Sequence, residues 1–271
     1  MDMRKTDYDW TMSFLDRLRA FLAADRAKSP AERLTGRPTS SNRASSHHLF
    51  WMTQSNEPVV EIRATLEVVE PPTVAELYFW ALQASFTDGS TNFGGAHLGL
   101  QHHPRYPDSS AANWGGYHDA SRGGQILDGS RLTVPSALNN ANTGNFAWRP
   151  HTPYVLRIRQ GQQGWLGSIT GPDGEEHVLR ELYCPGSAIR SPLVWTESFA
   201  QCDAPRATVR WSELTMVNRS GAALPVRAVR TNFQSVADGG CSTSDSTVDG
   251  ASVLQSTGVS RTTSTGEILD W

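Results

Sequence analysis

The alternation of apolar and polar residues divides the chain into a short helical segment and a long β segment. In residues 11–27 the large apolar side chains recur at helical spacing, with charged side chains between them. These residues are Phe14, Leu15, Leu18, Phe21 and Leu22. The spacing predicts one amphipathic helix within an N-terminal region of residues 1–28. Such a helix would dock on the main domain, associate with a second copy of the chain or lie on a membrane surface, and its near-neutral polar face disfavours the membrane. Association would make a homo-oligomer through residues 11–27.

Residues 29–46 are rich in Pro, Ser, Gly and Arg and have no apolar period, which is typical of a flexible linker. From residue 47 to residue 271, short apolar or alternating runs are separated by turn residues. This pattern predicts an all-β domain, either a sandwich or a barrel, and we expect an antiparallel β-sandwich of the jelly-roll kind. The predicted strands are 48–53, 58–69, 75–86, 95–102, 125–127, 154–159, 164–169, 176–183, 193–200, 206–217 and 225–234.

Two parts of this domain lack a clear period. Residues 103–150 contain many Pro, Gly and Asn residues, and a loop of this length in a compact domain is usually functional. Residues 239–265 are rich in Ser, Thr, Gly and Asp. We expect an ordered loop there, with one short edge strand at Val253 and Leu254.

Alternation also predicts which side chains share a face. In residues 75–86 one alternating set is wholly apolar and should face the core. This set is Tyr78, Trp80, Leu82, Ala84 and Phe86. Gln83 then points to the opposite face. In the same way His97 shares a face with Gln101, and Trp195 shares a face with Glu197. If the three strands are neighbours, these five side chains line one concave surface.

A surface of this kind suits a carbohydrate or another polyhydroxylated ligand. Aromatic rings stack on the apolar face of a sugar, while amide, imidazole and carboxylate groups bind its hydroxyls. Trp114 and Tyr117 lie beside glycines that allow close approach, so they could add a second stacking platform. The competing interpretation is that the tryptophans are core residues. Binding of such a ligand is the leading functional hypothesis.

Catalysis is the second hypothesis. Glu197 is an acid on an otherwise apolar strand face, where burial would raise its pKa. With His97 as a partner it would serve a polysaccharide hydrolase or lyase. The chain has no G-x-S-x-G elbow, no zinc-binding spacing and no phosphate-binding glycine loop. A structural or self-associating protein is the third hypothesis.

The sequence suggests two alternative metal sites, a transition-metal site at His97 with Gln101 or His103 and, ahead of it, a calcium site. Asp238, Asp245 and Asp249 stand in a turn-rich loop with many hydroxyl and carbonyl oxygens, which are the ligands that calcium prefers. The segment does not follow the EF-hand pattern. Otherwise these aspartates cap turns, and no cofactor is implied.

The charge balance narrows the choice of partners. The chain has 24 Lys and Arg and 27 Asp and Glu, a net charge of −3, which does not fit a nucleic-acid partner. It has no apolar run long enough for a membrane span and no secretory signal, so we expect a cytoplasmic protein, with export by another route left open. Three cysteines cannot all pair, and reduced thiols are the default; a Cys202–Cys241 bridge is the alternative.

Several segments of the β region resemble a group of actinobacterial proteins of uncharacterised function. They are 77–86 (LYFWALQASF), 96–104 (AHLGLQHHP), 113–117 (NWGGY), 193–202 (LVWTESFAQC), 208–214 (TVRWSEL) and 231–241 (TNFQSVADGGC). This group is similar to bacterial domains of the laminin-G-like and concanavalin-like β-sandwich type. The resemblance implies the same sandwich for residues 47–270. It assigns no catalytic residue, because the group has no established activity.

Overall fold

The protein is built from antiparallel β-strands. The structure is a computed structural model that describes residues 32–271, so the helix predicted over residues 11–27 lies outside the described residues. Sixteen strands form one continuous hydrogen-bonded sheet. They are β1 (Ser45–Trp51), β2 (Val59–Glu70), β3 (Tyr78–Thr87), β4 (Asn92–His102), β5 (Ser110–His118), β6 (Thr143–Asn145), β7 (Pro153–Gln160), β8 (Trp165–Thr170), β9 (Glu176–Leu182), β10 (Ala188–Ser198), β11 (Ala207–Asn218), β12 (Ala223–Pro225), β13 (Ala228–Phe233), β14 (Ser244–Asp249), β15 (Ser252–Thr257) and β16 (Ile268–Asp270).

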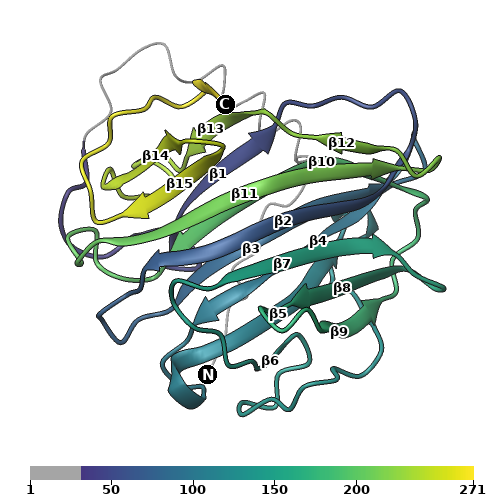
Figure 1. Cartoon of the computed structure of the whole chain (residues 1–271). Coiled ribbons are helices and arrows are strands. Elements are labelled where there is room, and N and C mark those ends of the chain that lie inside the picture. The colour runs from purple at the N-terminus through teal and green to yellow at the C-terminus, as the bar shows by residue number, and fades with distance from the viewer. Residues whose placement is uncertain (1–31) are drawn as a thin grey trace.

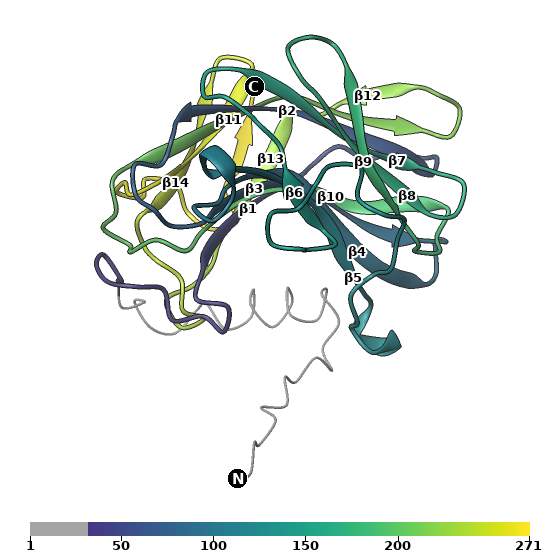
Figure 2. The same ribbon diagram turned by 90° about the horizontal axis from the view of Figure 1, so that it is seen from below.

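The sheet folds over on itself to give two layers (Figures 1 and 2). One layer, which we call the β2 layer, has the order β14-β15-β11-β2-β7-β8-β9. The other, the β10 layer, has the order β16-β13-β1-β10-β3-β4-β5-β6. The two layers join where Val59 of β2 pairs with Ile189 of β10. The predicted all-β antiparallel class is therefore confirmed.

The main core lies between the two layers. Its largest fully buried side chains include Trp80, Trp114, Trp165 and Trp211. Phe86 of β3 stacks on Trp165 of β8, with 4.6 Å between ring centroids, and so joins the layers. The apolar set predicted for residues 75–86 is entirely buried in this core. The alternation therefore identified the inward face of β3 correctly.

A buried glutamine connects the layers where the core is polar. Gln255 of β15 has no exposed surface, and its Oε1 accepts hydrogen bonds from Trp211 Nε1 at 2.9 Å and Thr196 Oγ1 at 3.0 Å. Its Nε2 donates to the carbonyl oxygen of His47 at 3.0 Å. Trp211 belongs to the β2 layer, whereas Thr196 and His47 belong to the β10 layer. One amide thus connects four strands.

Several boundaries differ from the sequence prediction. The 103–150 segment is not a single loop, because it contains β5 and β6, and small residues hid the alternation of β5. Residues 239–265 carry two strands, β14 and β15, in place of one edge strand, and β16 follows them. No strand forms over residues 125–127, where Ile126 makes an isolated bridge to Tyr117.

The described part of the predicted linker is packed against the domain. Residues 45 and 46 begin β1, and Ala44 is buried. The backbone N–H of Thr39 donates to Gly239, and that of Cys202 donates to Gly36. The flexible linker was therefore wrong for residues 32–46, since their polar groups find partners in distant loops.

Cys202 and Cys241 form a disulfide, so the default of reduced thiols was wrong for these two residues. The bridge joins the loop after β10 to the loop before β14. Cys184 is a free and buried thiol, and burial raises its pKa to about 11. Over residues 32–271 there is no helix that is both long and apolar enough to cross a membrane.

Replacing Gln255 tests the connection between the layers. Gln255→Leu removes the hydrogen-bond partners of Thr196, Trp211 and His47 while keeping the volume. Because buried polar groups are then left unpaired, we expect the free energy of unfolding to fall by about 3 kcal/mol. Chemical denaturation measures this value. The matched Gln160→Leu, at an exposed position of β7, should change it by less than about 0.5 kcal/mol; equal effects would contradict the role of Gln255.

Removing the disulfide should also destabilise the fold. The bridge closes a loop with a sequence separation of 39, for which loop-closure entropy predicts a loss of about 4 kcal/mol. The variant is the double substitution Cys202→Ser and Cys241→Ser, measured by denaturant titration. A reductant should weaken the wild type and leave the double variant unchanged. If the reductant affects both proteins equally, the bridge is not the source of the effect.

Candidate functional site

The face of the β10 layer that points away from the main core gathers the side chains predicted to form the site. The pairing order β10-β3-β4 confirms that the three strands are neighbours. In register, Glu197 lies opposite Phe79, which lies opposite Gln101. Gln83 lies between Leu193 and His97 in the same way. Because residues opposite one another share a face, these side chains point to the same side. We call it the outer face.

Aromatic rings form a compact group at the centre of the outer face. The Phe79 and Trp195 ring centroids are 5.0 Å apart, and His97 lies 5.5 Å from Phe79 and 5.7 Å from Trp195. His48 of β1 lies 6.0 Å from Trp195. Phe50, Ala81 and Leu193 complete a second apolar cluster with Phe79 and Trp195, separate from the main core. The outer face is therefore apolar at its centre.

Burial controls the charge of the titratable groups on this face. It lowers the pKa of His97 and that of His48 to about 4 each, so both imidazoles are neutral at neutral pH. Burial also raises the pKa of Glu197, and a hydrogen bond from Asn42 partly opposes this shift. The Asn42 Nδ2 donates to Glu197 Oε1 at 2.9 Å. Glu197 is thus the one acidic side chain among the residues placed on this face.

Four polar atoms of the outer face are buried without a hydrogen-bond partner in residues 32–271. They are Gln101 Oε1, Asn113 Oδ1, Trp195 Nε1 and His48 Nδ1. Asn113 belongs to this face because its neighbour Trp114 points into the core. Buried polar atoms are normally paired in native proteins, since leaving one unpaired is unfavourable. Ten other side-chain atoms in residues 32–271 are also buried and unpaired, and two of them, Trp114 Nε1 and Trp165 Nε1, lie in the main core, so such atoms are not confined to this face.

The two aromatic residues of the 113–117 segment, Trp114 and Tyr117, lie in different environments. Trp114 is fully buried in the main core, where Gly167 of β8 makes room for it; a Cβ at Gly167 would lie 2.6 Å from its ring. It is therefore a core residue and not the platform that we expected. Tyr117 is 54% exposed. It lies four residues from Asn113 on β5, and so on the same face, at its edge.

The three aspartates proposed for calcium do not come together. Asp245 accepts hydrogen bonds from Thr262 and Thr263. Burial raises the pKa of Asp245, but these hydrogen bonds lower it, and the net effect is a lower pKa. Asp249 pairs with Arg210 at 3.0 Å. Asp238 accepts a hydrogen bond from the Ser235 hydroxyl within a turn. Each carboxylate thus has a structural partner of its own, and the predicted site does not form.

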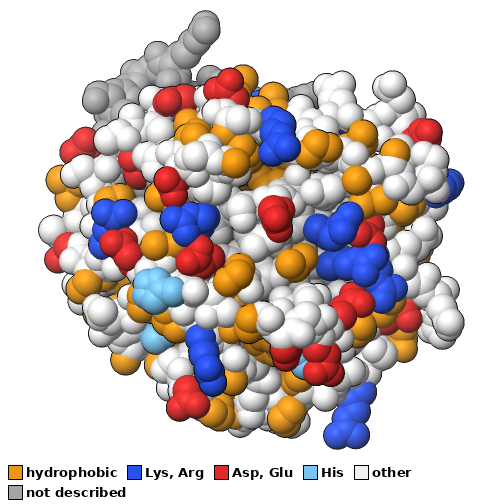
Figure 3. All heavy atoms as spheres, in the orientation of Figure 1, with side chains coloured by type: hydrophobic (Ala, Val, Ile, Leu, Met, Phe, Trp, Pro, Cys, Tyr) orange, Lys and Arg blue, Asp and Glu red, His pale blue; other side chains and the backbone are white. Residues whose placement is uncertain are grey.

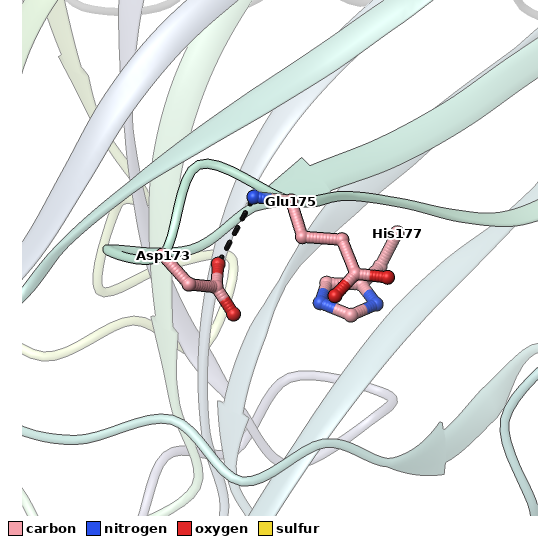
Figure 4. A group of neighbouring side chains, drawn as sticks. All are labelled: Asp173, Glu175 and His177. Carbon is pink, nitrogen blue, oxygen red and sulfur yellow. Dashed lines mark hydrogen bonds between the residues drawn. The ribbon is translucent and has the colours of Figure 1, made fainter.

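A different group of potential metal ligands lies in the β8–β9 hairpin. Asp173, Glu175 and His177 bring one ligand atom each within 4.8 Å of one another (Figure 4). The carboxylate of Asp173 already accepts the backbone N–H of Glu175 at 3.0 Å, which stabilises the turn. Both acids are exposed, and no further contact points to an ion. The group is explained by the hairpin itself.

The outside of the β2 layer has a groove that the sequence did not predict. It has a volume of about 630 Å³ and lies over β2, β7 and β11. Glu213 adopts a positive φ of 53° at a bulge of β11 and accepts a hydrogen bond from Thr65 at 2.8 Å. The interruption of alternation between Trp211 and Leu214 was the available sequence signal.

Charged side chains around this groove neutralise one another. Figure 3 shows Arg and acidic side chains intermixed on this side of the molecule. Arg210 pairs with Glu67 at 2.6 Å, and Arg63 pairs with Glu61 at 3.0 Å.

Comparison with protein-family models and with curated proteins finds no match. Among solved structures, Scytalido-glutamic peptidase with a peptide-based transition state analog aligns with a TM-score of 0.40 and 9% identity. SCP-B, a member of the Eqolisin family of peptidases in a complex with the tripeptide Ala-Ile-His, aligns with a TM-score of 0.39 and 9% identity. Each alignment covers 82% of this chain and 98% of the other. Likeness at this level does not assign an activity.

The protonation of His97 can be measured directly. We expect an NMR titration to give a pKa of about 4, below the ordinary value of 6.5, because burial disfavours the charged ring. A base whose pKa is lower in the folded state stabilises the fold above pH 6.5, and this contribution is lost as the pH falls towards 4. His97→Gln should reduce that pH dependence. Titration of His97 near 6.5 would show that the ring is solvated.

Proposed function

We propose that the outer face of the β10 layer binds a carbohydrate or a similar polyhydroxylated ligand. The observation that supports this is an aromatic cluster on one sheet face, with the amide of Gln101 in the row of Phe79 and the amide of Asn113 in the row of Trp195. Rings of Phe79 and Trp195 supply apolar surface for the flat side of a sugar ring. The amides of Gln101 and Asn113 supply donors and acceptors for hydroxyl groups.

The charge state of the face favours a neutral ligand. His48 and His97 are uncharged at neutral pH, so they act as hydrogen-bonding groups and not as cations. Glu197 supplies a carboxylate that accepts hydrogen bonds from hydroxyls. Arg230 of β13 lies opposite Phe50 on the same face, with its guanidinium 5.8 Å from the centroid of that ring, so the face carries one cation and one acid. We therefore place neutral sugars ahead of acidic ones.

Hydrolase or lyase chemistry at Glu197 and His97 is the second proposal. The raised pKa of Glu197 suits a proton donor. However, Glu197 is hydrogen-bonded to Asn42 within residues 32–271. Across the sheet, Glu197 lies in the same row as Phe79 and Gln101, and His97 lies in a different row. A retaining glycosidase also needs a second carboxyl about 5 Å away. The geometry therefore supports binding ahead of catalysis.

Kinship with concanavalin-like and laminin-G-like jelly rolls also remains a proposal, supported by the two antiparallel layers. The Cys202–Cys241 bridge favours folding in an oxidising compartment, in contrast to the cytoplasmic location that the sequence suggested.

A glycan-array screen of the full chain, with calcium and with a chelator, tests the leading proposal. Gln101→Leu removes the unpaired amide and keeps the side-chain volume, so we expect affinity for any glycan that binds to fall about tenfold, the worth of one or two hydrogen bonds. Gln160→Leu on the β2 layer is the control and should bind as the wild type. Absence of binding under both conditions, or unchanged affinity of Gln101→Leu, would overturn the proposal.

A further inference from the structure

The groove on the outside of the β2 layer is formed around a bulge in β11, and we call it the β11 groove. Between Ser212 and Thr215, two residues of β11 lie opposite a single position of β2. The second of them, Leu214, is buried in the main core, whereas the first, Glu213, is exposed and lines the groove. A bulge often re-aims a side chain next to a functional site.

Glu213 has a backbone conformation that glycine adopts more easily. Its φ of 53° lies in the left-handed region, which is strained for a residue with a side chain. Residues held in such conformations cluster at functional sites. The side chain is also held in place, because the Thr65 hydroxyl donates a hydrogen bond to Oε2 of Glu213 at 2.8 Å. The other carboxylate oxygen, Oε1, has no hydrogen-bond partner within residues 32–271 and can accept a hydrogen bond from a ligand.

Arg227 brings the opposite charge to the same groove. The backbone N–H of Val226 donates to the carbonyl oxygen of Leu214 at 2.8 Å, so Arg227 directly follows a contact with the bulge. By backbone dimensions, the Cα atoms of Glu213 and Arg227 are therefore at most about 13 Å apart. Arg227 is exposed, and its guanidinium forms no hydrogen bond or ion pair with any of residues 32–271. Two opposite charges thus line one groove without pairing with each other.

We propose that the β11 groove binds a short peptide with free ends, whose ammonium group pairs with Glu213 and whose carboxylate pairs with Arg227. The carboxylate has a second cation nearby, because Arg63 also lines the groove. Arg63 shares the carboxylate of Glu61 with Arg157, so its charge is only partly neutralised. A ligand with one positive and one negative end complements this arrangement of charges.

The size and the walls of the groove favour a peptide over a free amino acid. The volume of about 630 Å³ lies within the range of small-ligand sites and exceeds what one amino acid fills. Three residues of extended chain measure about 10 Å, which is close to the separation of the two charged positions. Val155, Ala223 and Pro225 supply apolar surface for small side chains.

An NMR titration of the full chain with trialanine tests this proposal. We expect saturable shifts of the Leu214 and Thr215 amide signals, with a Kd on the order of 1 mM because exposed ion pairs are individually weak. Glu213→Gln keeps the volume and the acceptor for Thr65 but removes the charge, so it should raise the Kd about fivefold. It should not change the Kd of N-acetyl-trialanine, which lacks the ammonium group. Arg227→Gln should likewise weaken trialanine and not trialanine amide, which lacks the carboxylate.

Glu267→Gln is the matched control, because it removes the same charge from an exposed position outside the groove. It should leave the Kd of trialanine unchanged. The proposal is overturned if Leu214 and Thr215 do not shift up to about 20 mM trialanine, or if Glu213→Gln and Glu267→Gln weaken binding equally. Shifts confined to Gln101 would overturn it as well, because the peptide would then bind the outer face. The groove and the outer face belong to different layers, so this proposal and the carbohydrate proposal can fail separately.

Discussion

Gln255 forms hydrogen bonds with buried polar groups that apolar side chains would leave unpaired. Where the two layers meet near β15, an indole N–H, a hydroxyl and a backbone carbonyl are all buried, and each needs a partner. The amide supplies one acceptor oxygen and one donor nitrogen in the required directions. Because two of its partners lie on β1 and β10, the same interaction fixes the position of the strands that carry the outer face.

The register of β10, β3 and β4 determines which side chains lie next to one another on the outer face. Trp195 lies in register with Ala81 and Gly99, whose small size leaves space beside the indole. Larger polar side chains stand in the rows on either side, at Gln83 and Gln101. The centre of the face is therefore apolar and its surroundings are polar, an arrangement that can hold an amphipathic partner without a deep pocket.

The alternation of apolar and polar residues predicted this arrangement, because the face to which a side chain points depends only on its position along its own strand. It identified the inward set of β3 and placed Gln83, His97, Gln101, Trp195 and Glu197 on the outer side. It failed at Trp114, because the flanking Ala and Gly residues of β5 carry no inward or outward signal. It also failed for calcium and for residues 32–46 of the predicted linker. Those outcomes depend on partners such as Thr262 or Gly239, which are distant in sequence and invisible to a local pattern.

The position of β1 has a consequence for the order of assembly. This strand lies between β10 and β13, so its two neighbours are made more than a hundred residues later. Pairings this distant in sequence fold slowly, because a long loop must close before any contact forms. During synthesis the β10 layer cannot be complete until β13 and then β16, which ends at Asp270, have left the ribosome.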